Sequence, residues 1–268
     1  MEPTNSLTKA ELDTAAAVEM GFSRTSTDWD DDQAAMVDEV VKMAQRRVYF
    51  TEANPQLGIP AGYKWTFLKP VATLTLPSGS KYLDLPDDFG GLEGMMSVAQ
   101  SGETGFWPIP QISEPQIRVL HANDTESTGE PQCVAVEQRP GTTATEGQRA
   151  RLVVFPTSDA AYTLQCQYYL TPGATSGSRP YPYGGSQHAE LFHAAVLACV
   201  EFKVHGMIAE RDAYFMRRLA TSVEIDQRNR EQTLGRVVDN SDGLHYRDRL
   251  RRRDGTSWGV LFNGVEYE

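Results

Sequence analysis

Helical patterns at both ends of this chain enclose a middle region of short strands, and this order constrains the fold more than any other feature. A first helix is predicted over residues 9–20, because Thr8 and Glu11 can form a capping box. A second begins at the acidic residues 28–32, where negative charge is favoured, and continues to about Phe50. Its apolar residues have the spacing of a helix that buries one face: Val37, Val40, Val41, Ala44 and Val48.

Two more helices are predicted toward the other end of the chain. One runs from a cap at Ser186 to about His205, and the next from Ile208 to about Arg230. The first has two apolar faces, which predicts a central position in a bundle. Those faces hold His188, Phe192, Ala195, Cys199 and Phe202 on one side and Ala189, Ala194 and Ala198 on the other. In the second helix, the inward residues are expected to be Ile208, Phe215, Leu219 and Val223.

From Pro55 the sequence changes to short alternating runs separated by proline and glycine, which is typical of strands. Residues 73–76 and 81–85 are predicted to form a hairpin around a four-residue turn. Further strands are expected over 92–98, 133–137, 151–155 and 161–170, with a short helix over 113–121. The middle of the chain is therefore predicted to be an antiparallel β module.

These patterns predict an α+β fold in which a helical bundle, formed by the N- and C-terminal helices, carries an inserted antiparallel β module and an extended C-terminal arm. The expected parts are 1–54 for the N-terminal helices, 55–172 for the β module, 173–234 for the C-terminal helix pair and 235–268 for the arm.

Charge and composition narrow the possible classes of protein. A net charge of -11 disfavours a general nucleic-acid binder, since that affinity depends on neutralising phosphates. We see no hydrophobic run of the roughly 20 residues that a membrane span needs, and no signal-peptide pattern at the N-terminus, so we expect a soluble protein of intracellular origin without a membrane partner. The cysteines Cys133, Cys166 and Cys199 are widely separated, which predicts buried thiols.

Motifs for catalysis and for metal binding do not emerge. His188 and His193 are five residues apart, whereas a zinc-binding H-E-x-x-H helix requires four, so both are expected to be structural. The adjacent carboxylates Asp87 and Asp88 are the best candidates for a hydrolase, but a solvated turn explains them better. We therefore expect no enzyme activity, no catalytic residue, no cofactor and no metal.

The last segment, after about Leu234, has the composition of an interaction arm. Five arginines between residues 247 and 253 are followed by widely spaced apolar anchors. Arginine and aromatic residues are the usual interface anchors. The predicted partner-binding residues are Arg247, Arg249, Arg251, Arg252, Arg253, Trp258, Phe262 and Tyr267. A disordered tail and DNA contact in a channel are the alternative interpretations, which the aromatic tip and the flanking Asp248 and Asp254 weaken.

Several short sequence motifs, and their order along the chain, resemble those of the head-to-tail adaptor (connector) proteins of tailed bacteriophages, including the tail tubular and gatekeeper-like adaptors of short-tailed phages. They are Arg46–Phe50, the Pro-Asp-Asp-Phe phrase within Tyr82–Phe89, and Leu152–Pro156 followed by Leu164–Tyr169. The helix pair and the arm follow them in the expected places.

This resemblance implies a structural virion protein that forms a ring, expected to have twelve copies, under the portal protein. The ring would link the capsid vertex to a tail nozzle or tail-tube protein and leave a channel through which DNA passes only as cargo. Its place would be the head-tail junction of the virion, after assembly in the host cytoplasm. A tail terminator or head-completion protein remains an alternative, and a carboxylate-based hydrolase a less favoured one.

Overall fold

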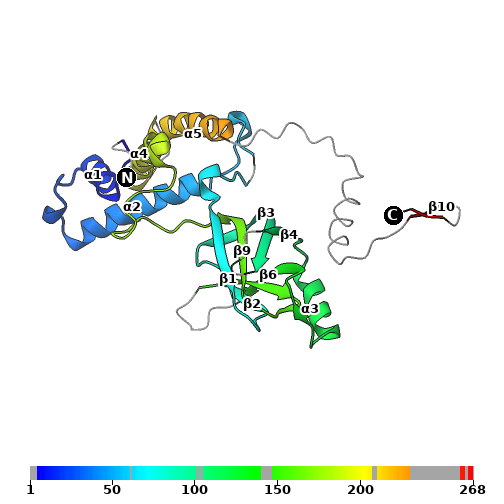
Figure 1. Cartoon of the computed structure of the whole chain (residues 1–268). Helices are drawn as coiled ribbons and strands as arrows, with labels where there is room; N and C mark the ends of the chain where they lie inside the picture. The colour runs from blue at the N-terminus through cyan, green and yellow to red at the C-terminus, as the bar shows by residue number, and fades with distance from the viewer. Residues whose placement is uncertain are drawn as a thin grey trace. The chain divides into compact units, whose positions relative to one another are not determined.

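A computed structural model describes residues 5–60, 62–100, 102, 105–139, 147–206, 210–229, 260–262 and 265–267. Backbone contacts divide the chain into two units, Met1–Asn229 and Arg230–Glu268. Figure 1 shows helices and antiparallel sheets in the first unit, so the α+β class predicted from the sequence is confirmed. Among the described residues, no helix is both long and apolar enough to cross a membrane.

The first two helices begin where the sequence predicts. Helix α1 spans Lys9–Glu19, and its capping box is complete because Thr8 and Glu11 each accept a hydrogen bond from the other's backbone. Helix α2 spans Asp31–Tyr49 behind a second capping box between Asp30 and Gln33. All five apolar residues of its predicted stripe are buried.

Helix α4 (Ala189–His205) packs against α1, α2 and α5 (Glu210–Arg228). It is buried on several sides from Ala189 to Val200, which explains its two apolar faces. Helices α2 and α5 are also joined directly. Arg47 forms an ion pair with Asp212, and its guanidinium lies 4.4 Å from the ring centroid of Phe215.

Two details of α4 differ from the prediction. Ser186 does not cap the helix, because it lies in the 3₁₀ turn Gly185–His188 and His188 occupies the cap position without a side-chain bond. Phe202 is 49% exposed instead of buried, because the last turn of α4 extends beyond the part of the helix that is covered on several sides. The predicted Ile208 lies outside the described residues.

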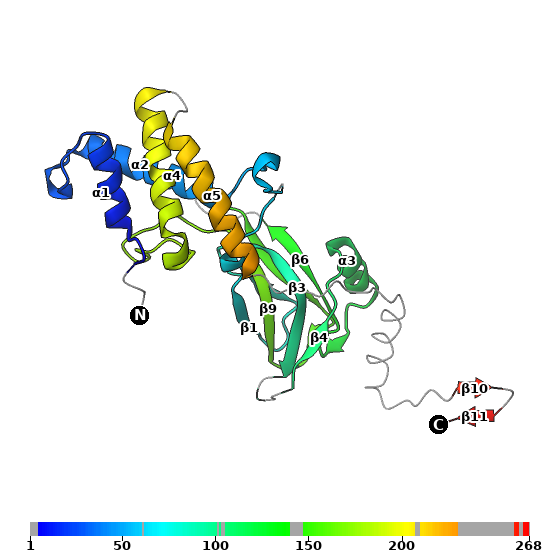
Figure 2. The same ribbon diagram turned by 90° about the horizontal axis from the view of Figure 1, so that it is seen from above.

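The β module is a sandwich of two antiparallel sheets. One sheet has the order β1-β9-β3-β4, from Val71–Leu76, Tyr162–Leu170, Phe89–Gln100 and Trp107–Ile109 (Figure 2). The other has the order β2-β7-β6, from Tyr82–Asp84, Arg149–Phe155 and Cys133–Arg139. Their inner faces share a core that includes Leu76, Val98, Leu152, Val154 and Leu164.

The predicted hairpin over residues 73–85 is wrong. Strand β1 pairs with β9, and β2 pairs with β7, so the turn at 77–81 carries the chain from one sheet to the other. Ser158 holds this crossing, because its hydroxyl donates to the carbonyl oxygens of Pro77 and Ser80 at 2.6 and 2.9 Å. Ser158 also belongs to β8 (Thr157–Ser158), which forms a short parallel pair with β5 (Thr128–Gly129).

The bundle and the sandwich share part of one hydrophobic core. Tyr168 and Leu170, at the end of β9, are buried in the same cluster as the residues of α2, α4 and α5. Trp65 is fully buried there and donates from Nε1 to the carbonyl oxygen of Val48 at 2.8 Å. Helix α3 (Glu114–Asn123) packs on the other end of the module, against β6 and β7.

In the second unit, β10 (Val260–Phe262) and β11 (Val265–Tyr267) form an antiparallel pair.

Candidate partner-binding surfaces

Most of the predicted partner-binding residues lie outside the described part of the chain. This applies to Arg247, Arg249, Arg251, Arg252, Arg253 and Trp258. Phe262 ends β10 and Tyr267 ends β11, where Phe262 pairs with Val265 and Tyr267 pairs with Val260. This hairpin was not predicted from the sequence. The dipeptide Asn263-Gly264 was the signal that could have revealed it, since Asn-Gly is the preferred sequence of a two-residue hairpin turn.

A buried carboxylate holds the end of α5, just before the first unit ends. Asp226 has no exposed surface. It accepts hydrogen bonds from the Tyr63 hydroxyl at 2.6 Å, from the Thr66 hydroxyl at 2.6 Å and from the Thr66 amide at 2.9 Å. Asn229, the last residue of this unit, donates from its side chain to Gln187 at 3.3 Å. The point from which the C-terminal segment departs is therefore fixed to the core.

His188 lies in an aromatic environment close to this carboxylate. Its ring centroid is 5.5 Å from that of Trp65 and 5.0 Å from that of Phe67. Nδ1 is buried and has no hydrogen-bond partner in the described structure. Burial lowers the pKa of His188, and the charge of Asp226 only partly opposes this effect. Burial therefore favours the neutral imidazole, which packs against the rings of Trp65 and Phe67.

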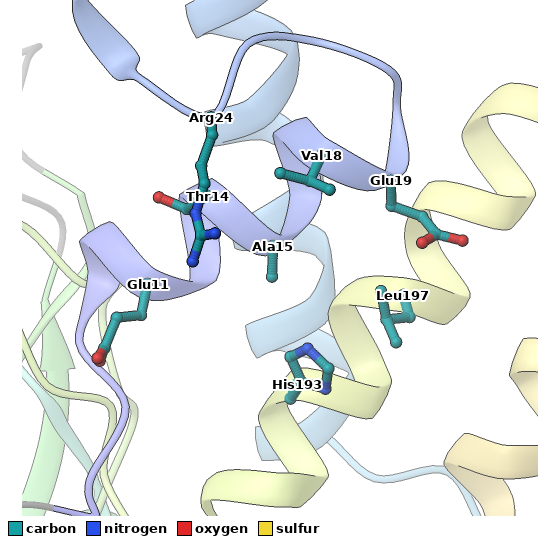
Figure 3. A pocket seen from close by; sticks show the side chains of 8 residues that line it. All are labelled: Glu11, Thr14, Ala15, Val18, Glu19, Arg24, His193 and Leu197. Carbon is teal, nitrogen blue, oxygen red and sulfur yellow. The ribbon is translucent and has the colours of Figure 1, made fainter.

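A surface groove of about 620 Å³ lies between α1 and α4. Figure 3 shows Ala15 on the side of α1 that faces α4, from which His193 and Leu197 project. Val18 is 53% exposed beside them. The groove thus has an apolar floor that another chain could cover.

The charged groups around this groove are not equivalent. Glu11 is engaged in the capping box, whose bonds from Thr8 lower its pKa. Glu19 pairs with Arg211 of α5 at 2.9 Å. Arg24 lies on the rim, and among the described residues it has no ion-pair partner. The groove therefore offers one uncompensated positive charge next to apolar surface.

Helix α3 presents a second exposed apolar surface, which we call the α3 face: Ile112, Pro115, Gln116, Val119 and Leu120. The opposite side of the helix is anchored, because Ile117 is buried against Cys133, Ala135 and Val153. Val119 and Leu120 belong to the same helix and are exposed. The α3 face is therefore a candidate contact surface.

The two adjacent carboxylates considered for hydrolysis contact different groups. Asp87 is 82% exposed and lies 3.1 Å from Nε of Arg149. Asp88 accepts from the Tyr168 hydroxyl at 3.2 Å. Burial and the neighbouring Asp88 raise the pKa of Tyr168 to about 12. The carboxylates do not converge on one point where an acid/base pair could act. The described residues also contain no cluster of three metal-ligating side chains.

The chain was compared with models of protein families. The model described as the SU10 adaptor protein matches residues 7–253. That range includes the bundle, the sandwich and all five arginines of the C-terminal segment, and it ends before Trp258. A comparison with curated proteins found no match.

Proposed function

The chain belongs to the SU10 adaptor protein family, and from this premise we propose that it is a structural protein of a bacteriophage virion that joins the head to the tail. The family match over residues 7–253 is the observation that carries this proposal. An adaptor has no chemical step to perform, which agrees with the divergent contacts of Asp87 and Asp88.

In this proposal the protein forms a ring of twelve copies beneath the portal protein of a short-tailed phage, after assembly in the host cytoplasm. The charge distribution supports a channel for DNA. Residues 1–229 contain 18 Lys and Arg against 29 Asp and Glu, a net charge of -11, whereas residues 230–268 contain seven of each. An acidic wall does not neutralise phosphates, so DNA can pass it without adhering.

The four parts, 1–54, 55–172, 173–234 and 235–268, have different tasks in this proposal. The two helical parts form the wall of the ring. The β module reaches the tail through the α3 face, and the C-terminal arm attaches to the portal or to a neighbouring subunit.

The arginines of the arm are the proposed source of portal attachment. Residues 247–253 contain five arginines and one aspartate, a net charge of +4 in seven residues. Such a segment pairs with acidic surfaces, while Trp258, Phe262 and Tyr267 supply aromatic anchors.

Cryo-electron microscopy of the full chain mixed with the portal protein of the same phage tests this function. We expect a ring on the portal. Replacing the five arginines 247, 249, 251, 252 and 253 by serine should abolish attachment, whereas replacing them by lysine keeps the charge and should retain part of it. A ring on the tail tube and none on the portal would overturn the adaptor role in favour of a tail terminator.

The tail contact has its own test. Val119→Asp places a charge on the α3 face without touching the side that packs on the sandwich. We expect it to block binding of the tail nozzle protein and to leave portal attachment unchanged. Arg118→Glu, on the same helix, is the matched surface control, because Glu114 is the ion-pair partner of Arg118 among the described residues.

A further inference from the structure

Three of the four edge strands of the sandwich have features that hinder pairing with another strand, whereas β1 has none of these features. Strand β4 contains Pro108, which cannot donate a hydrogen bond, and β2 has only three residues. Strand β6 is covered by the segment before α3, because the Ile112 amide donates to the Val134 carbonyl at 2.8 Å and the Val134 amide donates to the Pro110 carbonyl at 3.1 Å. Strand β1, at the edge of the four-stranded sheet, has neither kind of protection (Figure 2).

The register of β1 shows which of its backbone groups face outward. The Tyr168 amide donates to the carbonyl of Pro70, just before the strand, so the even-numbered residues of β1 bond to β9. The amides and carbonyls of Val71, Thr73 and Thr75 therefore point away from the sheet. Within the described part of the chain, these groups have no hydrogen-bond partner.

The sequence of β1 favours pairing with another strand. It reads Val-Ala-Thr-Leu-Thr-Leu, without a charge or a proline, and Val71 is 70% exposed. Natural edge strands usually carry lysine, proline or a bulge to prevent pairing. A six-residue, uncharged and β-branched edge is instead the kind of strand to which an extended segment can add.

We infer that strand β1 of one copy is extended by the C-terminal hairpin, β10–β11, of another copy of this chain. An isolated two-stranded hairpin is marginally stable in water, so it gains most by joining a larger sheet. Residues 258–267 contain no lysine or arginine and a single acidic residue, Glu266, so they match the uncharged edge. Within its described residues, each copy has one such edge and one such hairpin.

Chain length allows the second copy to be a neighbour. Residues 230–259 connect the first unit to β10, and about 30 residues can span up to about 100 Å. Donating a hairpin and receiving one use different surfaces, so the contact is head-to-tail and closes into a ring when the rotation fits. The ring symmetry rests on the proposed function, whereas the contact itself needs only two copies.

Residue-resolved amide hydrogen exchange of the full chain tests this contact, both alone over a range of concentrations and bound to the portal. The amides of Ala72 and Leu74, which bond to β9, serve as internal references. We expect the amides of Val71, Thr73 and Thr75 to exchange freely in dilute protein and at least tenfold more slowly in the assembled state. Unprotected exchange in both the concentrated chain and the portal complex would overturn the inference.

Two proline variants test whether the β10–β11 hairpin is the segment that pairs with strand β1. Thr73→Pro removes an outward amide and leaves the bonds to β9, and Thr73→Val is its control because it keeps the amide. Leu261→Pro disrupts β10 in the donating copy and does not depend on the folding of β1. Both proline variants should lose the protection at Thr75. Protection that survives Leu261→Pro would show that something other than the hairpin covers β1.

The outcomes separate this inference from the adaptor role. Concentration-dependent protection in a chain that fails to bind the portal would keep the strand contact and overturn the proposed function. Portal attachment without protection of the β1 amides would support the proposed function and overturn the strand contact.

Discussion

The hydroxyl of Tyr63 donates a 2.6 Å hydrogen bond to Oδ2 of Asp226, and this bond joins the segment that precedes strand β1 to the last turn of α5. The carboxylate is fully buried, so the donors that surround it compensate for its lost hydration. The residues lie 163 positions apart in the sequence. The bond therefore fixes the end of α5 to the segment between α2 and β1, three residues before the first unit ends at Asn229.

Removing this hydroxyl should destabilise the protein. Tyr63→Phe leaves Asp226 with the donors of Thr66 and is expected to lower the free energy of unfolding by about 1.5–3 kcal/mol, the usual cost of losing a hydrogen bond to a charged group. Urea unfolding of both proteins measures the difference. Tyr181→Phe is the matched control, because Tyr181 is exposed, and it should change stability by less than about 0.5 kcal/mol. Equal effects of the two substitutions would show that the bond contributes nothing.

The buried His188 should make stability depend on pH near neutrality. Burial lowers its pKa below the ordinary value of 6.5, so the unfolded chain binds a proton more readily than the folded protein. The neutral ring contributes fully to the free energy of unfolding above pH 6.5. This contribution is lost as the pH falls toward the pKa of the folded state, and the free energy of unfolding then changes by up to about 1.4 kcal/mol per pH unit.

Unfolding at pH 7.5, 6.5 and 5.5 measures this slope. The variant His188→Phe keeps an aromatic ring against Trp65 and should flatten the dependence between these values. A slope that persists in His188→Phe would assign the effect to another group.

Local sequence signals predicted the helices well, because a cap and an apolar stripe lie within a few turns of each other. Thr8 with Glu11 located the start of α1, and the valines of α2 identified its buried face. The same signals could not place residues whose partners are remote. Asp226 looks like any polar helix residue until Thr66, 160 positions away, is brought next to it.

Sheet pairing was harder to predict for the same reason. Residues 73–85 have the pattern of a hairpin, yet Ser158 holds their turn from 78 positions away and the two strands join different sheets. The composition of the C-terminal segment predicts that it binds a partner, and most of that segment lies outside the described residues.

The close approach of β3 to β9 leaves no room for a side chain at Gly90. A Cβ there would lie 2.8 Å from the carbonyl oxygen of Tyr169 and 2.7 Å from the hydroxyl of Thr171. Because the carbonyl belongs to the backbone of a central strand, it cannot move aside, and Gly90→Ala should cost about 1–3 kcal/mol. Gly105→Ala, where the added carbon meets nothing within 4 Å, is the control. Thermal unfolding should show a lower midpoint for the first variant alone.

Two phenylalanines of α4 separate the stability of the subunit from its assembly. Phe192 is fully buried among the helices, whereas Phe202 is half exposed in the last turn. Phe192→Ala should cost about 3–5 kcal/mol because it leaves a cavity in the core. Phe202→Ala should change the stability of the isolated chain by less than about 0.5 kcal/mol.

Chemical unfolding of dilute protein measures both substitutions under conditions where copies do not associate. The comparison is controlled internally, since the two residues share a helix and a residue type. A large loss from Phe202→Ala in dilute protein would mean that the end of α4 is packed within the subunit. If the loss appears only at concentrations where copies associate, the exposed side chain of Phe202 is buried by another copy, because the same truncation then removes apolar contact area only in the assembly.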